Sequence, residues 1–379
     1  MIYFDTASTS FYKPEIVKQA VLNAMNEFAS YGRGAHPAAM AASRAVFIAR
    51  AALADFFGAK ANQIVFTHNA TESLNMAIFG LLNNETDAHV ITTVLEHNSV
   101  LRPLYHLEQR GLLKLDFVGL DSSGNLDYSA FKKLLRKNTK CIVVTHCSNL
   151  TGLLVDINRI ASFCKENNLA LIVDAAQSAG LFPISTTKLG RAVLCFTGHK
   201  GLMGPQGTGG LVVNEITLTP LVMGGSGSNS FSKSHPDSMP EALEAGTLNS
   251  HGIAGLAAGV GYIKEIGIEN ILNYSQNLAE TFKDGISHLK NIHILGNNNL
   301  TLAPIVSFTI GNLDSSQIEL TLAQNGICAR GGFHCAPLAH QIYGTSKKGA
   351  IRFSFSSFNT LDQVNIAIKV ISKIEKEVI

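Results

Sequence analysis

The sequence lacks several features that would place it in a specialised class of protein. Its 379 residues contain no apolar run of about 18 residues, so no membrane-spanning helix is expected. Residues 1–5 lack the basic and then apolar form of a signal peptide. The net charge is only +2, so we predict no basic surface for nucleic acid.

The cysteine patterns of metal and redox sites are also absent. The six cysteines are scattered along the chain and include no CxxC pair. We therefore expect free thiols, a reducing cytoplasm and no metal site. Charged residues are few, at 15%, whereas hydrophobic residues make up 46%. This composition suits an enzyme with much buried surface, or one that buries more surface in a dimer.

The chain is long enough for two domains and a large core. The β-rich run 141–145, an expected helix over 157–168 and the run 170–174 predict a βαβ unit with a right-handed crossover. Residues 261–288 are expected to be helical.

One stretch dominates the sequence pattern. The apolar run 171–173 predicts a buried strand that ends at an acid, Asp174, and ligands of α/β proteins bind beyond the carboxyl ends of parallel strands. Gln177 follows three residues later, and Lys200 follows Asp174 by twenty-six residues. A lone lysine is usually a solvated side chain. A lysine behind the turn 197–199, in a glycine-rich chain, could instead form a Schiff base with an aldehyde cofactor.

This stretch resembles the pyridoxal 5'-phosphate (PLP) site of the class V aminotransferase family, in its cysteine desulfurase branch. The family pattern is an acid, two small residues and a glutamine, followed later by Ser/Thr-x-His-Lys, and the chain has all of these. The resemblance implies that Asp174 keeps the ring nitrogen protonated, that Gln177 bonds the ring hydroxyl oxygen, and that Lys200 holds the aldehyde and moves the substrate α-proton. It places Thr197 and His199 at the cofactor phosphate.

Other candidates follow predicted strands or open a helix. Thr71, after Ala70, lies at the expected start of a helix, where free N–H groups form an anion site, although most such threonines are simple caps. His97 and Asn149 follow predicted strands; taken alone, each is usually a surface or turn residue. The resemblance places Ala70 and Thr71 at the cofactor, stacks His97 on its ring, and brings Asn149 to cofactor and substrate.

Two further motifs carry the resemblance. By composition, 31–37 is an ordinary Gly/Pro loop, but its RG-x-H pattern marks subgroup two of the family and makes His36 a candidate for substrate binding. Residues 244–249 match the family pattern E-x-G-T-x-N, in which the threonine, here Thr247, reaches the phosphate of the partner subunit. Locally, Thr247 is equally suited to cap a helix expected over 253–266.

The segment 327–337 is the second informative stretch. Cys335 lies in a glycine-rich loop near arginine and histidine, where a thiol can have a lowered pKa and act as a thiolate. Cys328, in an apolar strand, is expected to be a small buried residue. The segment resembles the R-x-G-x-H-C-A of subgroup-two cysteine desulfurases, whose cysteine accepts the sulfur. Arg352 needs a partner if its strand is buried. By resemblance it binds the substrate α-carboxylate, with Arg330 as a second candidate for substrate binding.

The resemblance covers nearly the whole chain and implies an α/β protein of PLP fold type I. A large PLP-binding domain, residues 14–258, would surround a mostly parallel seven-stranded sheet. Residues 1–13 and 259–379 would form a smaller α/β domain, and the protein would be a homodimer.

The implied reaction converts L-cysteine to L-alanine, with the sulfur transferred to Cys335 as a persulfide. Catalysis would use Lys200, Cys335 and His97. The sulfur would then pass to an acceptor protein for sulfur mobilisation, such as iron–sulfur cluster assembly. Selenocysteine lyase, another PLP-dependent C–S lyase and a class V aminotransferase remain alternatives. A non-catalytic PLP-fold protein that binds a partner or regulates is a further alternative.

Overall fold

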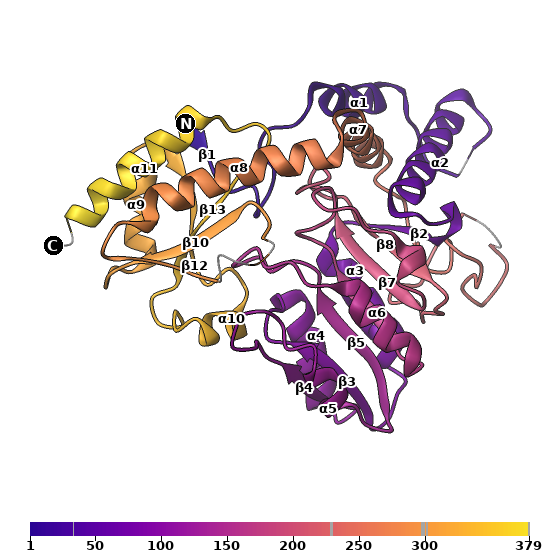
Figure 1. Cartoon of the computed structure of the whole chain (residues 1–379). Helices are drawn as coiled ribbons and strands as arrows, with labels where there is room; N and C mark the ends of the chain where they lie inside the picture. The colour runs from indigo at the N-terminus through magenta and orange to yellow at the C-terminus, as the bar shows by residue number, and fades with distance from the viewer. Residues whose placement is uncertain (33, 228–229, 297–299, 301, 378–379) are drawn as a thin grey trace.

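The computed structural model describes residues 1–32, 34–227, 230–296, 300 and 302–377. Within these residues the strands form a seven-stranded, a four-stranded and a two-stranded sheet. Figure 1 shows the two larger sheets in neighbouring parts of the molecule, with the long helix α8 (Ile268–Ser287) over the smaller one. No helix in the described ranges combines the length and the apolar character needed to cross a membrane.

The seven-stranded sheet is parallel except at one strand. Its order is β2 (Ile64–Thr67), β8 (Gly209–Asn214), β7 (Ala192–Thr197), β6 (Ala170–Asp174), β5 (Thr139–Thr145), β3 (Ala88–Thr93) and β4 (Leu113–Val118). Only β8 runs antiparallel to its neighbours, β2 and β7, among the described strands. The mostly parallel seven-stranded sheet predicted from the sequence is therefore confirmed.

Helices cover both faces of this sheet because its strands are apolar on both faces. On β5, Ile142 and Val144 pack with one hydrophobic cluster, and Cys141 and Val143 pack with the other. This alternation is the two-residue period of a strand. The first cluster includes residues of α2 (Pro37–Phe57), α6 (Ile157–Glu166) and α7 (Ser250–Ile266), and the second includes residues of α3 (Ala70–Leu82) and α4 (Asn98–Gln109). The predicted β5–α6–β6 unit is confirmed, with β5 and β6 parallel.

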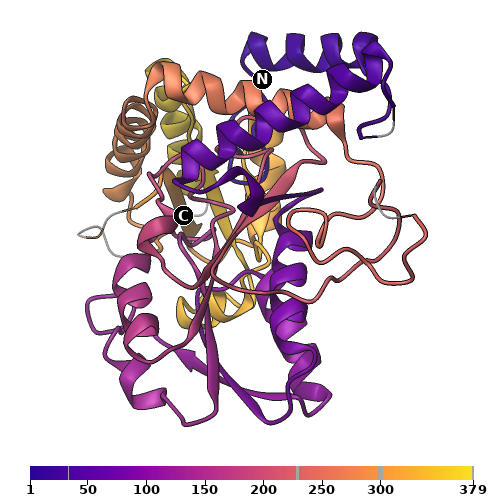
Figure 2. The same ribbon diagram turned by 90° about the vertical axis from the view of Figure 1, so that its right-hand side faces the viewer.

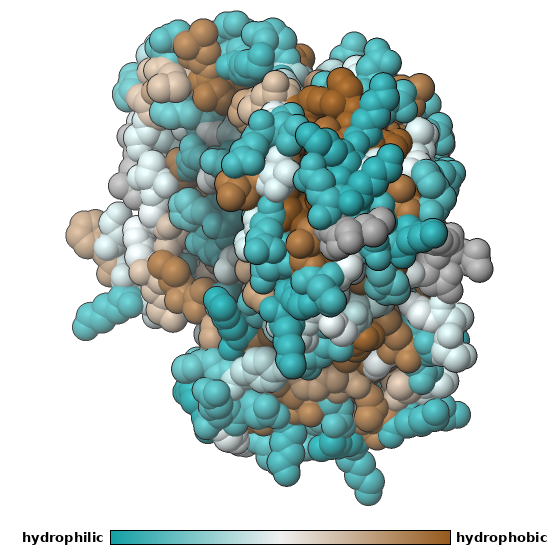
Figure 3. Space-filling view, turned by 90° about the vertical axis from the view of Figure 1, so that its left-hand side faces the viewer, coloured by the Kyte–Doolittle hydropathy of each residue, from teal (hydrophilic) through white to brown (hydrophobic). Residues whose placement is uncertain are grey.

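The four-stranded sheet is antiparallel and has its own core. Its order is β12 (Arg330–Gly332), β13 (Ala350–Ser354), β10 (Ile305–Ile310) and β9 (Ile292–Ile294). Five aromatic rings fill the core beneath it: Phe4, Phe282, Phe308, Phe353 and Phe355. Helices α8, α9 (Ser315–Gln324) and α11 (Leu361–Lys376) complete this core. On the face of the molecule seen in Figure 3, hydrophilic side chains are interspersed with small apolar patches.

The start of the chain is joined to its last third. β1 (Ile2–Tyr3) pairs in parallel with β11 (Ile327–Cys328), and Phe4 packs in the core of the smaller sheet. The other elements are α1 (Glu15–Glu27), α5 (Ala130–Leu134), α10 (Pro337–Ile342) and two short 3-10 helices, η1 (Ala61–Gln63) and η2 (Thr186–Lys188). The prediction of one continuous helix over 261–288 is wrong, because the structure has two helices there. Gly267, with φ 90°, separates α7 from α8 because this backbone conformation ends a helix.

Candidate active site

The carboxyl ends of four neighbouring parallel strands bring the candidate residues together. Asp174 ends β6 and Thr197 ends β7, while His97 and Asn149 follow β3 and β5 within four residues. Lys200 lies three residues beyond β7. Because β3, β5, β6 and β7 run in the same direction, these residues emerge at the same edge of the sheet.

One pocket of about 470 Å³ forms at this edge. All nine residues predicted to bind the cofactor from within one chain line it: Ala70, Thr71, His97, Asn149, Asp174, Gln177, Thr197, His199 and Lys200. A mostly apolar cavity of about 530 Å³ adjoins this pocket and shares Gln177 and Lys200 with it. Gln177 is fixed here because its Nε2 donates to the carbonyl oxygen of Ala7, 2.9 Å away.

Asp174 is a buried acid that lines the pocket. Its side chain is 4% exposed, and Oδ1 accepts a hydrogen bond from the backbone N–H of Ala176 at 2.9 Å. Burial raises the pKa of Asp174, while the Ala176 N–H and the charge of Lys200 oppose this rise. A nearby cation would stabilise the charged form of this buried carboxyl group.

Lys200 lies in a setting that disfavours its charged form. Burial is the largest cause, and the charges of Arg352 and Arg330 add to it, whereas Asp174 and Asp5 act in the opposite direction. Together these effects lower the pKa of Lys200 from 10.5 to about 8. A neutral amine is the form that attacks an aldehyde, so this lysine is suited to covalent attachment of a carbonyl cofactor.

His97 presents a neutral imidazole to the pocket. It caps α4, and its Nδ1 accepts the backbone N–H of Ser99 at 3.0 Å, so the ring proton lies on Nε2. Burial and the charge of Lys200 lower the pKa of His97 to about 4. The hydroxyl of Ser99 lies 2.7 Å from that of Thr71, which links α4 to the first turn of α3.

Two polar atoms at the pocket lack a partner within the described chain. The hydroxyl of Thr197 and Oδ1 of Asn149 are buried, and neither makes a hydrogen bond there. Buried polar atoms in native proteins are nearly always bonded, so both point to a polar ligand. Nearby, the first turn of α3 has free N–H groups, because Asn69 caps only the N–H of Glu72.

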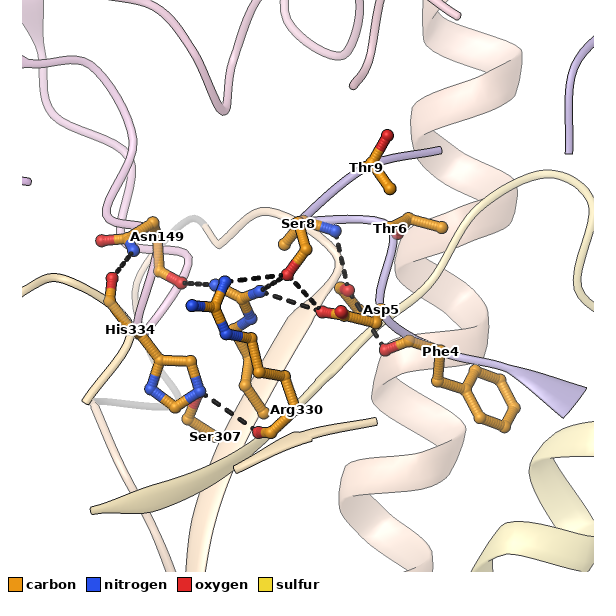
Figure 4. Close-up of polar contacts among 12 residues, drawn as sticks. Phe4, Asp5, Thr6, Ser8, Thr9, Asn149, Ser307, Arg330 and His334 are labelled. Atoms are coloured by element: carbon orange, nitrogen blue, oxygen red, sulfur yellow. Dashed lines mark hydrogen bonds and ion pairs between the residues drawn. The ribbon is translucent and has the colours of Figure 1, made fainter. Parts of the chain in front are cut away.

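Arg352 is almost fully buried on β13 and is paired, as its sequence context required. Figure 4 labels its partners Asp5, Ser8 and Asn149. Its Nη2 donates to Oδ1 of Asp5 at 3.0 Å and to the hydroxyl of Ser8 at 2.8 Å. Its Nη1 donates to the carbonyl oxygen of Asn149 at 3.0 Å. Since Asn149 lines the pocket, this last bond joins the smaller sheet to the edge of the larger one.

Cys335 lies on the loop between β12 and α10, beside the same edge of the sheet. Its side chain is half-buried, and both Cys335 and His334 adopt positive φ values, 53° and 49°. The Cys335 carbonyl accepts the N–H of Asn98 at 2.8 Å, and the His334 carbonyl accepts Nδ2 of Asn149 at 2.6 Å. Two residues of the large sheet's edge therefore hold this loop.

A chain of neutral side chains supports the loop from behind. Nδ1 of His334 lies 3.4 Å from Nε2 of His340, and Nδ1 of His340 lies 2.6 Å from the hydroxyl of Thr345. Nε2 of His334 faces the carbonyl oxygen of Arg330 at 3.2 Å. Burial lowers the pKa of His334 to about 2 and that of His340 to about 4, so both rings are neutral at physiological pH. One set of tautomers satisfies every bond: Thr345 donates to His340, His340 to His334, and His334 to the Arg330 carbonyl.

Comparison with known proteins identifies the family. The model of the family described as Aminotransferase class-V matches residues 2–366. The chain belongs to this family. A probable cysteine desulfurase of Pyrococcus abyssi (strain GE5 / Orsay) is 34% identical over 393 residues, which cover 99% of this chain and 94% of that protein.

Two solved structures of cysteine desulfurases are similar to this chain over nearly their whole length. The apo structure of cysteine desulfurase from Thermococcus onnurineus NA1 is 35% identical with a TM-score of 0.93, covering 99% of this chain and 95% of the other. The cysteine desulfurase CsdA (S-sulfonic acid) from Escherichia coli is 25% identical with a TM-score of 0.89, covering 100% and 95%. The α/β arrangement of PLP fold type I is therefore confirmed.

The class-V aminotransferase family depends on PLP, and the pocket residues fit this cofactor. The unpartnered hydroxyl of Thr197 and the free N–H groups at the start of α3 suit a phosphate. The buried carboxyl group of Asp174 suits a protonated ring nitrogen, and Lys200 suits the aldehyde.

Five of the predicted site residues do not line this pocket in the single chain: Arg330, Arg352, Cys335, His36 and Thr247. His36 is exposed and caps α2, where its Nδ1 accepts the N–H of Ala39 at 3.4 Å; Arg33, in the same motif, lies outside the described residues. Thr247 is exposed as well. Its alternative role as a helix cap is wrong, because α7 begins at Ser250 and Oδ1 of Asn249 caps it. Asn249 is the capping residue because a cap must directly precede its helix.

Several supporting residues were not predicted from the sequence. Ser99 lines the pocket, and Asp5 and Ser8 hold Arg352. Glu96 is fully buried, and its Oε1 accepts the Thr145 N–H at 3.0 Å and the hydroxyl of Thr93. It thus ties the ends of β3 and β5 together beneath His97. The sequence signal that could have identified Glu96 is its position directly before the predicted site residue His97.

A buried ion pair fixes the segment that precedes Thr247. Arg50 of α2 makes two parallel hydrogen bonds to Glu244, at 2.8 and 2.9 Å, and the N–H of Phe66 adds a third at 2.8 Å. Both charged side chains are almost fully buried. The glutamate of the E-x-G-T-x-N motif therefore has a structural role in holding this segment on the large sheet.

Proposed function

We propose that this protein is a PLP-dependent cysteine desulfurase that converts L-cysteine to L-alanine and takes up the sulfur on Cys335. One observation carries the proposal: Lys200, Asp174 and His97 line one pocket, and the N–H next to His97 bonds the Cys335 carbonyl. The similar proteins that bear the name cysteine desulfurase support it.

The pocket residues would bind different parts of the cofactor. Asp174 would hold the ring nitrogen, Lys200 the aldehyde, and Thr71, Thr197 and His199 the phosphate. When bound, PLP withdraws electrons from the substrate α-carbon, which makes the α-proton acidic. The neutral ring of His97 suits the face of the cofactor because it adds no charge there.

Lys200 and Arg352 act on the substrate itself. The guanidinium of Arg352 binds the α-carboxylate and orients the α-carbon, and its buried Nε, which has no partner among the described residues, is the donor available for this bond. Nζ of Lys200 removes the proton from this carbon, for which a pKa of about 8 is well matched to neutral pH.

Cys335 accepts the sulfur. Its thiolate attacks the sulfur of the substrate, and the bond between this sulfur and the substrate β-carbon breaks. The electron pair of the broken bond stays with the carbon, which takes up a proton, so alanine leaves and Cys335 holds a persulfide.

The active unit would be a homodimer. Exposed apolar residues gather on α1 and α2, which lie side by side in Figure 2: Ile16, Leu22, Met25, Met40, Phe47 and Ile48. A second copy covering this face would bury them. Thr247 and His36, both exposed, would then reach the pocket of the partner subunit.

The remaining assignments belong to the same proposal. Residues 14–258 form the PLP-binding domain, and 1–13 with 259–379 form the smaller one. All strands of the seven-stranded sheet fall within the first range, and those of the four-stranded sheet within the second. The six cysteines are all free. This supports a reducing cytoplasm and delivery of the Cys335 sulfur to an acceptor protein, as for iron–sulfur cluster assembly.

The test measures products from L-cysteine with wild type, Cys335→Ser and Cys328→Ser. Cys328 is the matched control, since it is the other half-buried cysteine. With a thiol reductant added to release the persulfide sulfur as sulfide, we expect alanine and sulfide from wild type and Cys328→Ser, and a loss of at least about 100-fold in Cys335→Ser. Pyruvate and ammonia would indicate an eliminating lyase, and a colourless protein after PLP addition would indicate a non-catalytic one. Undiminished turnover by Cys335→Ser would remove this cysteine from the mechanism.

A further inference from the structure

The loop that carries Lys200 is anchored by the start of the chain. The carbonyl oxygen of His199, the residue before Lys200, accepts the backbone N–H of Ser10 at 2.8 Å. The Ser10 hydroxyl lies 3.0 Å from the same oxygen, the Thr9 hydroxyl 3.2 Å and Nζ of Lys13 3.5 Å. Four donors therefore surround one carbonyl oxygen, which has only two lone pairs. The Thr9 hydroxyl has a second possible partner, Nδ1 of His199, 3.0 Å away.

Lys13 fixes the direction of the hydrogen bonds around Ser10. Burial lowers the pKa of Lys13 to about 8, so it remains mostly charged at pH 7, and an ammonium can only donate. Its Nζ donates to the Ser10 carbonyl at 2.6 Å and to the Ser10 hydroxyl. That hydroxyl therefore directs its own proton to the His199 carbonyl. The N–H and the hydroxyl of Ser10 thus occupy both lone pairs of this carbonyl.

The proton of the Thr9 hydroxyl is left for the imidazole ring of His199. Nδ1 of this ring is nearer to the hydroxyl oxygen than the filled carbonyl is, at 3.0 against 3.2 Å. Nε2 of Gln206, 3.5 Å away, donates to the same hydroxyl oxygen. In the opposite arrangement Nδ1 would donate to Thr9, and the Thr9 proton would be a third close donor to the carbonyl. The hydrogen bonds therefore favour Nδ1 as the acceptor.

The position of the ring proton decides what His199 offers to a ligand. Burial and the charges of Lys200 and Lys13 lower the pKa of His199 to about 4, so the ring is neutral and has one N–H. This N–H lies on Nε2 when Nδ1 accepts. His199 lines the cofactor pocket and Thr9 does not, so the side of the ring opposite Nδ1 faces the pocket. An N–H there can donate to a phosphate oxygen, whereas a bare nitrogen would repel it.

We propose that Thr9 sets the tautomer of His199, so that Nε2 presents its proton to the phosphate group of the cofactor. Thr9 is a positioning residue, because it acts through His199 and does not itself line the pocket. This inference rests on the proposed function for the identity of the cofactor. It extends the phosphate site to the start of the chain.

The first measurement needs no cofactor. In protein with ¹⁵N-labelled histidine, nitrogen–proton correlation spectra distinguish a protonated ring nitrogen from a bare one, and His199→Gln identifies the signals of His199 among the 13 histidines. The wild type should have the His199 proton on Nε2. Thr9→Val keeps the shape of the side chain but removes its hydroxyl, so both tautomers should be populated. A proton on Nδ1 in the wild type, or the same single tautomer in Thr9→Val, overturns the inference.

The second measurement compares PLP with pyridoxal, which lacks the phosphate. The dissociation constant of each is measured from the visible absorbance of the attached aldehyde. In Thr9→Val the constant for PLP should rise on the order of tenfold, because a hydrogen bond to a charged group is lost, while that for pyridoxal stays within about twofold. Thr9→Ser retains a hydroxyl and should stay near the wild type for both.

Thr6→Val is the matched control. Thr6 belongs to the same segment as Thr9, as Figure 4 shows, but its hydroxyl donates to the Phe355 carbonyl at 3.4 Å. This variant should bind PLP as the wild type does. An unchanged constant for PLP in Thr9→Val, or an equal rise for PLP and pyridoxal, overturns the inference. Failure of the wild type to take up PLP would refute the proposed function instead, and the tautomer in the cofactor-free protein would still decide whether Thr9 orients His199.

Discussion

Cofactor-free protein should take up PLP with a pH dependence set by Lys200. Burial and the nearby arginines lower the pKa of this residue from 10.5 to about 8. Because each pKa unit changes the proton equilibrium tenfold, the neutral fraction of Lys200 at pH 7 is about 300-fold higher than for an ordinary lysine. The rate of covalent attachment should follow this fraction, since only the neutral amine attacks the aldehyde.

The assay follows the visible absorbance of the attached cofactor after PLP is added at pH values from about 7 to about 10. The direction of this pH dependence follows from the lowered pKa of Lys200. The rate rises with pH through about 8, where half of the amine is neutral, and becomes level about one pH unit higher, where nearly all of it is neutral. Arg352→Gln should move this transition upward, because the charge of Arg352 lowers the pKa of Lys200 and that of Asp5 raises it.

A rate that climbs steadily to pH 10 in the wild type would refute this reasoning. It would mean that Lys200 has the properties of a solvated lysine. A wild-type transition near pH 8 that stays in place in Arg352→Gln would show instead that Arg352 is too distant to lower the pKa of Lys200.

Three other predictions follow from buried contacts. Arg50→Met should lower the free energy of unfolding by about 3–5 kcal/mol in urea titrations, because it leaves the Glu244 carboxylate buried without its cation. Adding Glu244→Gln to this variant should recover much of the lost stability. Equal stability of the single and double variants would contradict this prediction. Asp174→Asn should reduce alanine formation by about 100-fold or more while Cys335 is still alkylated at the wild-type rate; full activity would exclude Asp174 as partner of the ring nitrogen. His340→Ala should lower the free energy of unfolding by about 2–4 kcal/mol in urea titrations, because the buried side chains of His334 and Thr345 each lose a hydrogen-bond partner; wild-type stability in this variant would contradict the proposed chain of hydrogen bonds.

The strand-end residues of the site were predictable from the sequence. A buried parallel strand reads as a short apolar run, and the polar residue that ends it must lie at the edge where ligands bind. Asp174 and Thr197 end such runs, and Lys200 follows closely. This local pattern, together with the family motifs, led to nine candidates for cofactor binding, and the structure brings all nine to one pocket.

Contacts between distant parts of the chain were not predictable in this way. The bond from Arg352 to Asp5 spans 347 positions, and no local period links the two residues. The sequence required a partner for a buried Arg352 but could not name it. Cys328 shows the reverse error: its apolar surroundings predicted full burial, but β11 is a two-residue strand paired only with β1 among the described strands, so the side chain is half-buried.

The most direct test of the central claim is to identify the lysine that holds the cofactor. Borohydride reduction of the PLP-loaded protein fixes the bond between the aldehyde and its amine, and peptide mass spectrometry then locates the added mass. Lys13 is the built-in comparison, because burial lowers its pKa to about 8 as well. The added mass is expected on Lys200 alone. Added mass on Lys13, or on no lysine, would contradict it.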